Sequence, residues 1–293
     1  MAADLSHAGA RELIPPHVLE RVPGCEGGQP PIAVARSSGG SVNTTWRVVT
    51  SAGRFVVRLH GEDPAALGID RTREARLHAA AARADLAPAL VYADPGGAFL
   101  ITELLEGRPW KPGDFADPAC LTRIAGTLKV LHSLPPPAVP RFDPAAILRR
   151  HVERIVQAEP SAAAELEALL ARALAVLNAL EGEGRTPCIV HNDLHHSNVI
   201  GWERPRLIDW EYAGVADPLF DLACVHAYYP QSARFDRLLL EETGLARAAT
   251  PESLRLAGWL FVLLAYLWHR SRRISGAAGS GDLEAERELR ERL

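Results

Sequence analysis

Apolar and polar residues alternate at the spacing of β-strands in the first third of the chain. The alternation predicts strands at 32–37, 43–50 and 54–59, which are joined by short turns rich in Gly and Ser. Two further strands, at 89–93 and 98–102, flank the sequence Asp-Pro-Gly-Gly, which favours a hairpin. This part of the chain therefore predicts a small antiparallel sheet.

The spacing of apolar residues is helical in most of the remaining chain. One helix, at 70–84, interrupts the strands, and a short one is expected near 16–22. A stretch rich in Gly and Pro at 106–114 breaks the pattern and predicts a joint between two domains, 1–105 and 106–293. Beyond the joint, helices are expected at 118–133, 144–157, 161–182, 217–228, 230–243, 251–275 and 282–293. The pattern predicts an α+β protein with a sheet domain carrying one helix and a larger, mainly helical domain.

Two acidic motifs each follow a short apolar strand of the second domain. The sequence HNDLHHSN follows a strand expected at 187–190, and LIDWEYAG begins within a strand expected at 206–209. They supply Asp193, then Asn198 five residues later, and then Asp209. A phosphoryl-transfer site needs one carboxylate for the attacking hydroxyl, and an amide and a carboxylate for Mg²⁺. We therefore predict Asp193 as the catalytic base and Asn198 and Asp209 as metal ligands; turn-capping roles are the alternative.

The histidines of the first motif could be read as a zinc site. His191, His195 and His196 lie on one short loop without a cysteine, and side chains so close in sequence point partly in opposite directions. We expect His191 to be buried and to bond the loop backbone, in a structural role.

The third strand carries a candidate cation for the nucleotide phosphates. Arg58 lies near the end of this strand, and Glu74 on the following helix is its best candidate partner. The rivals for this pairing are Glu62, Asp63 and Asp70. The alternation of the strand does not settle which face Arg58 takes, so an exposed surface charge is the alternative.

The turn between the first two strands could cover phosphates through its backbone N–H groups. It contains Gly39, Gly40, Ser41 and Asn43 but neither of the usual phosphate-loop patterns. A phosphate-binding loop and an ordinary hairpin turn therefore both remain open.

Composition narrows the class of partner. The formal net charge of -4 argues against a nucleic-acid partner. The four cysteines are widely spaced, which favours a reducing cytoplasm over a disulfide framework. The first residues do not resemble a signal peptide, and the longest apolar run, 256–268, is too short to cross a membrane comfortably. The sequence leaves a monomer and a homodimer open.

These motifs resemble those of the aminoglycoside phosphotransferase and choline kinase superfamily, from about residue 32 to residue 275. HNDLHHSN is similar to its catalytic loop, and IDWEYAGVADPLFDLA looks most like the bacterial choline and thiamine kinases. The resemblance implies a protein-kinase-like bilobal fold that uses ATP and Mg²⁺. It also implies that adenine docks on backbone groups near Glu103 to Leu105. Protein kinases carry Lys at the position of Arg58, whereas choline-kinase-like members often carry Arg.

The resemblance implies an acceptor with a hydroxyl and a positive charge. Aromatic faces and carboxylates hold such cations well. The candidate aromatic wall is Trp210, Tyr212, Trp259, Tyr266 and Trp268, with Glu211, Asp217 and Asp221 as an acidic rim. Trp259 and Tyr266 share one face of the helix at 251–275, and Phe261 and Trp268 share roughly the opposite face, so at least one pair is expected in the core.

We therefore expect a kinase for a small cationic alcohol of the choline, ethanolamine or thiamine type. An aminoglycoside kinase, which needs a wider and more acidic pocket, is the rival within the class. A catalytically inactive nucleotide-binding protein is the rival outside it.

Overall fold

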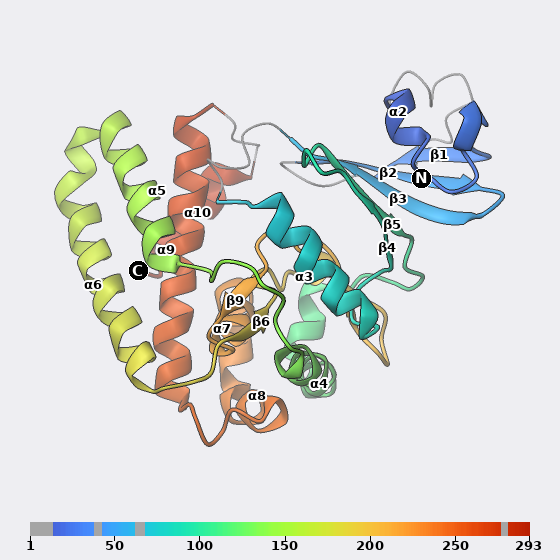
Figure 1. Cartoon of the computed structure of the whole chain (residues 1–293). Helices are drawn as coiled ribbons and strands as arrows, with labels where there is room; N and C mark the ends of the chain where they lie inside the picture. Colours follow the sequence, from blue (N-terminus) through green and yellow to red (C-terminus); the bar gives the residue numbers. More distant parts are fainter. Residues whose placement is uncertain (1–13, 38–42, 62–67, 277–280) are drawn as a thin grey trace. The chain divides into compact units, whose positions relative to one another are not determined.

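The computed structural model describes residues 14–37, 43–61, 68–276 and 281–293, which divide into two compact units. The first unit comprises the described residues up to Gly107 together with Arg206–Glu211, and the second comprises Arg108–Pro205 and Tyr212–Leu293. Sheet dominates the first unit and helices dominate the second, which confirms the expected α+β class (Figure 1). The segment with Asp209 thus belongs to the same compact unit as the sheet.

The first unit is built on a five-stranded antiparallel sheet in the order β1-β2-β3-β5-β4 (Figure 1). Its strands are Ala33–Arg36, Thr44–Thr50, Gly53–Leu59, Leu90–Ala93 and Phe99–Glu103, for β1 to β5 in chain order. Helix α3, Arg71–Arg83, lies between β3 and β4 in the chain. Asp70 caps its N-terminus by accepting hydrogen bonds from the backbone N–H groups of Thr72 and Arg73. The cap fixes where the first turn of α3 begins.

The two faces of this sheet differ. One face packs against the short helix α2, Pro16–Leu19, and the residues that follow it. Strand β3 contributes Phe55 and Val57 to this core, and burying such side chains stabilises the fold by about 1.5–3 kcal/mol each. Because side chains alternate along a strand, Val56 and Arg58 lie on the opposite face. The structure therefore settles the question that the sequence left open about Arg58.

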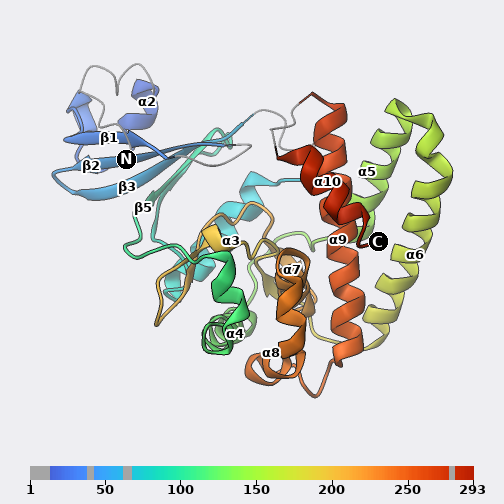
Figure 2. The ribbon, with the colours of Figure 1, turned by 180° about the vertical axis from the view of Figure 1, so that it is seen from behind.

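The second unit is a helical assembly organised around α9, Pro251–Ile274 (Figure 1 and, from behind, Figure 2). Helix α9 packs against five of the other described α-helices of this unit. The other helices are α4 (Pro118–Ser133), α5 (Pro144–Ala158), α6 (Ala163–Gly182), α7 (Leu219–Tyr228), α8 (Asp236–Thr243) and α10 (Asp282–Arg290). Thr250 caps the N-terminus of α9 in a reciprocal pair with Ser253.

Two short strands hold the acidic loop of the second unit. Strand β6, Cys188–Val190, is buried and pairs in antiparallel fashion with β9, Gly214–Ala216. The sequence predicted β6 but not β9, because three residues reading Gly-Val-Ala carry little periodicity. The helix expected at 230–243 is two elements, a 3₁₀ helix at Pro230–Phe235 and then α8. Across the described residues, no helix has the length and apolar character needed to traverse a bilayer.

Candidate active site

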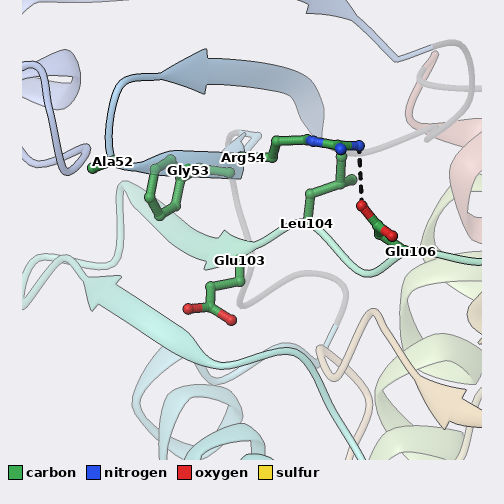
Figure 3. A pocket seen from close by; sticks show the side chains of 7 residues that line it. Ala52, Gly53, Arg54, Glu103, Leu104 and Glu106 are labelled. Carbon is green, nitrogen blue, oxygen red and sulfur yellow. Dashed lines mark ion pairs between the residues drawn. The ribbon is translucent and has the colours of Figure 1, made fainter.

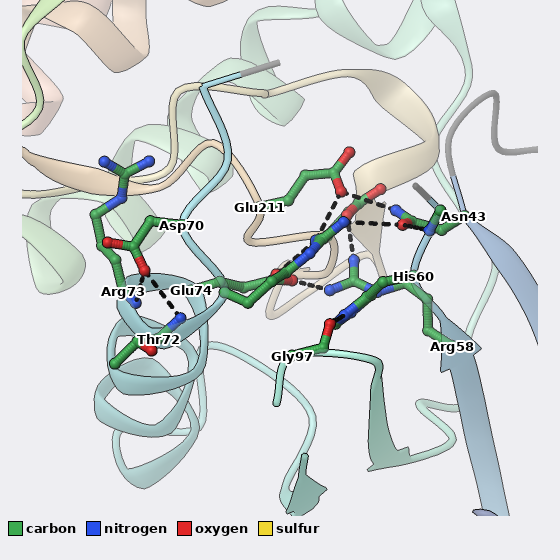
Figure 4. Close-up of polar contacts among 12 residues, drawn as sticks. Asn43, Arg58, His60, Asp70, Thr72, Arg73, Glu74, Gly97 and Glu211 are labelled. Atoms are coloured by element: carbon green, nitrogen blue, oxygen red, sulfur yellow. Dashed lines mark hydrogen bonds and ion pairs between the residues drawn. The ribbon is translucent and has the colours of Figure 1, made fainter. Parts of the chain in front are cut away.

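A cluster of buried charges lies in the first unit around Arg58 (Figure 4). The Arg58 guanidinium pairs with Glu74 of α3 through Nη2 and with Asp209 through Nη1. Arg58 and Glu74 are almost wholly buried, whereas about a third of the Asp209 side chain is exposed. The structure thus places the candidate phosphate cation beside both its expected helix partner and a candidate metal ligand.

A second arginine, Arg71, joins the cluster from the first turn of α3. Its Nη1 contacts Glu74 Oε2 at 2.8 Å and Glu211 Oε2 at 3.1 Å, and its Nη2 donates to Asn43 Oδ1 at 3.1 Å. Asn43 Nδ2 in turn donates to Glu211 Oε2 at 2.8 Å. Sequence reasoning missed Arg71, although its spacing of three residues from Glu74 on a helix was a usable signal.

The cluster carries an excess of negative charge. Two guanidinium groups face three carboxylates, those of Glu74, Asp209 and Glu211. Burial raises the pKa of Glu211, and the nearby charge of Asp209 adds to the rise. An added cation would relieve this repulsion, so the charge balance suits a metal ion held partly by Asp209.

His60 borders the cluster as a neutral side chain. Burial and the positive charge of Arg58 lower its pKa to about 3. Its Nδ1 lies 2.7 Å from the carbonyl oxygen of Gly97, so the neutral ring donates there (Figure 4). His60 adds no positive charge near neutral pH.

Asp209 has a left-handed backbone conformation, with φ of 64°. Asp and Asn enter this region more easily than most residues, and Asn192 of the other acidic motif does the same with φ of 62°. Both motifs therefore turn sharply at the point where a polar side chain is presented. Such conformations persist where surrounding contacts hold them, often at functional sites.

The end of strand β5, where the chain enters the joint at 106–114, offers backbone groups beside a shallow pocket (Figure 3). The N–H of Glu103 donates to the Ala89 carbonyl at 3.0 Å, and that of Leu104 donates to the Arg54 carbonyl at 2.9 Å. Leu105 has no such bond among the described residues. The pocket, of about 320 Å³, is lined by Ala52, Gly53, Arg54, Phe55, Glu103, Leu104 and Glu106.

In the second unit, Asp193 lies on the loop after β6, and both of its carboxylate oxygens accept hydrogen bonds. Asn198 Nδ2 donates to Asp193 Oδ2 at 2.9 Å and to the Asp193 carbonyl at 3.0 Å. The Tyr228 hydroxyl donates to Asp193 Oδ1 at 2.6 Å. Because the Asn198 amide nitrogen faces Asp193, its Oδ1 is the atom directed away, which a metal ion could take.

The backbone of the acidic loop is held by Asp221, which is fully buried at the start of α7. Asp221 Oδ1 accepts from the N–H groups of His191 and Asn192, both at 2.9 Å. Asp221 Oδ2 accepts from His132 Nε2 at 2.9 Å. His191 is also fully buried, and its Nδ1 accepts from the Asp193 N–H at 3.3 Å. His191 is therefore buried and bonded to the backbone of its own loop.

The acidic side chains expected to form a rim have partners of their own. Asp221 is a core residue, and Asp217 accepts from Arg185 Nε at 2.8 and 2.9 Å and from the Leu219 N–H at the start of α7. Glu211 belongs to the Arg71 cluster of the first unit. None of these three described carboxylates is without a protein partner.

The five candidate aromatic residues separate into core and partly exposed groups. Trp210 and Tyr266 are 0% and 1% exposed, so they present almost no surface to a ligand. Trp259 lies under Arg172, whose guanidinium carbon is 3.8 Å from the ring centroid, and donates to the Leu293 carbonyl. Tyr212 and Trp268 are partly exposed and are joined by a 3.0 Å hydrogen bond from Trp268 Nε1 to the Tyr212 hydroxyl, but the Trp268 ring lies under Arg272, whose guanidinium carbon is 4.8 Å from the ring centroid. The alternative that most of these aromatics are packing residues holds for three of the five.

Sequence reasoning also missed Tyr228, the last residue of α7. Asp221 and Tyr228 are seven residues apart, which places them on one face of the helix. One holds the backbone of the acidic loop and the other holds the Asp193 carboxylate. The spacing was visible in the sequence, but it has meaning only once Asp221 is known to face the loop.

Two further expectations concern metal and phosphate. Within the described parts of the chain, no group of three or more His, Cys, Asp and Glu side chains could hold a metal ion. A Mg²⁺ ion needs fewer protein ligands, because phosphates and waters complete its shell. The predicted phosphate-loop residues Gly39, Gly40 and Ser41 lie outside the described residues.

Comparison with known proteins places these features in a family. The model of the phosphotransferase enzyme family matches residues 34–257. A search of curated proteins finds no match.

Solved structures share the fold. A choline/ethanolamine kinase family protein from Mesorhizobium loti superposes with a TM-score of 0.76 at 21% identity, covering 94% of this chain and 91% of that one. The choline kinase LicA from Streptococcus pneumoniae gives 0.75 at 19%, covering 89% and 92%. The streptomycin–ATP–APH(2")-IIa ternary complex gives 0.65 at 18%, covering 99% and 97%. These likenesses confirm the expected kinase-like fold.

Proposed function

Because the chain belongs to the phosphotransferase enzyme family, we propose that it transfers a phosphoryl group from ATP to a small cationic alcohol. The acceptor class is that of choline, ethanolamine or thiamine. The similar structures include choline kinases as well as a streptomycin–ATP complex, so the fold alone leaves the acceptor open. The choice rests on the side chains of this chain.

The first unit has the groups that an adenine nucleotide needs. The sheet face that carries Arg58 also presents Val49 and Val56, which are only partly buried and could pack against a purine ring. The Leu105 N–H can donate to the ring, since those of Glu103 and Leu104 are already used. Arg58, held by Glu74, provides a fixed positive charge for the phosphates.

Mg²⁺ is the metal that the chemistry and the sequence spacing of two oxygen donors favour. Asp209 and Asn198 provide one carboxylate and one amide oxygen, both hard ligands of the kind that Mg²⁺ takes together with phosphate oxygens. When bound, Mg²⁺ neutralises charge that develops on the phosphates during transfer. Arg58 forms an ion pair with Asp209, and this pairing holds the carboxylate in place.

Asp193 is the proposed base. It accepts the proton of the attacking hydroxyl and orients that oxygen, a contribution of about 10²–10⁴-fold for a positioned general base. Asp221 fixes the loop backbone on one side of Asp193, and Asn198 bonds its carboxylate on the other. A base held this firmly needs little rearrangement when the acceptor binds.

The choice of acceptor rests on whether the carboxylates of the expected acidic rim already have protein partners. A polyamine sugar needs several carboxylates that are ready to bind amines. Here Asp217 is taken by Arg185, Asp221 is in the core, and Glu211 is taken by Arg71. The partly exposed Tyr212 can instead offer aromatic surface to a single cationic group, whereas the ring of Trp268 already lies under Arg272. This pattern favours a monocationic alcohol over an aminoglycoside.

An acceptor screen tests the proposal. Purified protein with ATP and Mg²⁺ is incubated with choline, ethanolamine, thiamine, homoserine and a panel of aminoglycosides, and phosphomonoester formation is followed by ³¹P NMR. We expect transfer to one of the cationic alcohols and none to aminoglycosides. Transfer to aminoglycosides alone would reject the acceptor class, and saturable ATP binding without transfer to any acceptor would favour an inactive binder.

A further inference from the structure

The Tyr228 hydroxyl is placed against the carboxylate on which the proposed chemistry depends. It donates to Asp193 Oδ1 at 2.6 Å, while Asn198 donates to Oδ2. The motif spacing in the sequence assigns no role to this tyrosine. Tyr228 as a whole is 44% exposed, whereas the surroundings of its hydroxyl are buried.

The geometry points to Tyr228 as a positioning residue that fixes the plane of the Asp193 carboxylate; this inference rests on the proposed function. The torsion that rotates a carboxylate about its bond to Cβ has a broad energy profile. One donor on Oδ2 leaves that rotation largely open. A second donor on Oδ1 opposes it, because turning the group then breaks one of two bonds.

Two different elements supply these donors, which makes the restraint specific. Asn198 is five residues along the same loop, so it moves with Asp193. Tyr228 belongs to α7, whose first turn carries Asp221 and bonds the loop backbone. One rigid helix therefore fixes both the backbone and the side chain of the proposed base.

The surroundings keep Tyr228 in the state that can donate. The titratable side chains around it are Asp193, Cys224, Tyr212, His195 and Tyr229. Burial of its hydroxyl, followed by the negative charge of Asp193, holds the pKa of Tyr228 well above its ordinary value. Burial also lowers the pKa of His195, to about 4, so this ring is neutral beside the tyrosine near pH 7. The phenol thus remains protonated over the range in which a kinase is assayed.

The bonds from Tyr228 and Asn198 are compatible with Asp193 acting as a base. An ionised carboxylate has about four acceptor sites, so these two bonds do not by themselves exclude the hydroxyl of an acceptor. The tyrosine gives no proton to the product and takes none from the substrate. Its contribution is orientation, and small misplacements of a reacting group can cost up to about 10²-fold in rate.

The first arm of the test reads the hydrogen bond without activity. The chain has five tyrosines, and replacing them with 3-fluorotyrosine brings phenol titration into an accessible pH range. The Tyr228→Phe variant identifies the ¹⁹F resonance of Tyr228. In Asp193→Asn we expect this resonance to titrate at lower pH, because the negative charge that disfavours the phenolate is gone. An unchanged titration would overturn the inference.

The second arm reads the consequence for turnover. With the acceptor found by the screen, Tyr228→Phe should lower kcat by about 10- to 100-fold while KM for ATP stays constant. Tyr229→Phe is the matched control, since its hydroxyl bonds His196 at 2.7 and 2.8 Å and leaves Asp193 untouched. Equal kcat in Tyr228→Phe and the wild type would overturn the positioning role. If no acceptor is phosphorylated at all, the proposed function and the positioning role both fall, and the ¹⁹F arm still decides whether the hydrogen bond exists.

Discussion

Replacing Asp221 probes how the acidic loop is held in place. Its carboxylate is fully buried and accepts three hydrogen bonds of 2.9 Å, two from the backbone of the loop and one from His132. Asp221→Ala leaves all three donors without an acceptor. Removing one partner of a buried charged network costs about 3–5 kcal/mol. The free energy of unfolding that Asp221→Ala loses should therefore approach the whole free energy of unfolding of an ordinary domain.

Asp221→Asn is the more informative change because it preserves shape. The amide oxygen can still accept from the two backbone N–H groups, but the amide nitrogen then faces His132 Nε2. His132 must move its proton to Nδ1, which is buried and has no hydrogen-bond partner among the described residues. Leaving one buried donor unsatisfied costs about 1–3 kcal/mol.

Amide hydrogen exchange measures this cost where it arises. We expect exchange at His191 and Asn192 to accelerate by about tenfold for each 1.4 kcal/mol lost locally, with kcat falling as the base loses its fixed position. Asp236→Asn is the control, because it removes another buried carboxylate that faces a histidine, at 3.0 Å from His226 Nε2. Exchange at the loop amides that is as slow in Asp221→Asn as in Asp236→Asn would refute the reasoning.

Three other changes have defined outcomes. Glu74→Gln should raise KM for ATP about tenfold in steady-state assays, because Arg58 loses its buried charged partner. Glu106→Gln is the control, since it changes an exposed ion pair and should leave KM for ATP unchanged. Equal KM values in the two variants would contradict this prediction. Asp209→Asn should raise the Mg²⁺ concentration for half-maximal turnover at least about tenfold, and an unchanged Mg²⁺ titration would remove Asp209 from the metal site. Burial lowers the pKa of His151 from 6.5 to about 4, so the folded state disfavours its protonation. The unfolded chain then binds more protons between pH 6.5 and about 4, and this residue contributes about 3 kcal/mol of stability near pH 7 that is lost as the pH falls through that window. Urea denaturation of His151→Phe should therefore show a flatter acid dependence, and an unchanged slope would contradict the assignment.

Much of the fold could be predicted from the sequence because its periodicities are strong. The alternation in strand β3 predicted 54–59, against Gly53–Leu59 in the structure, and helical spacing predicted 118–133 for α4, with the same bounds. The strand β9 could not be predicted, because its three residues acquire a strand conformation only by pairing with β6. Sequence periodicity predicts long helices and strands, whereas a short strand forms only through pairing with a distant part of the chain, which periodicity does not reveal.

The candidate site could be predicted only in part. The roles of Asp193, Asn198 and Asp209 follow from spacing and remain predictions that kinetics must test. The acidic rim was less accessible to sequence reasoning, because a carboxylate such as Asp217 looks available until its arginine partner is known. The contact of Tyr228 with Asp193 and that of Arg71 with Glu211 were missed for the same reason, since these partners are distant in the sequence.

The central claim is that Asp193 acts as the base in transfer of a phosphoryl group from ATP to a cationic alcohol. The most direct measurement is single-turnover phosphoryl transfer to the best acceptor by the wild type and by Asp193→Asn, with ATP binding measured in parallel. We predict that the variant binds ATP normally and transfers about 10²–10⁴-fold more slowly. Transfer by Asp193→Asn at the rate of the wild type would contradict the account.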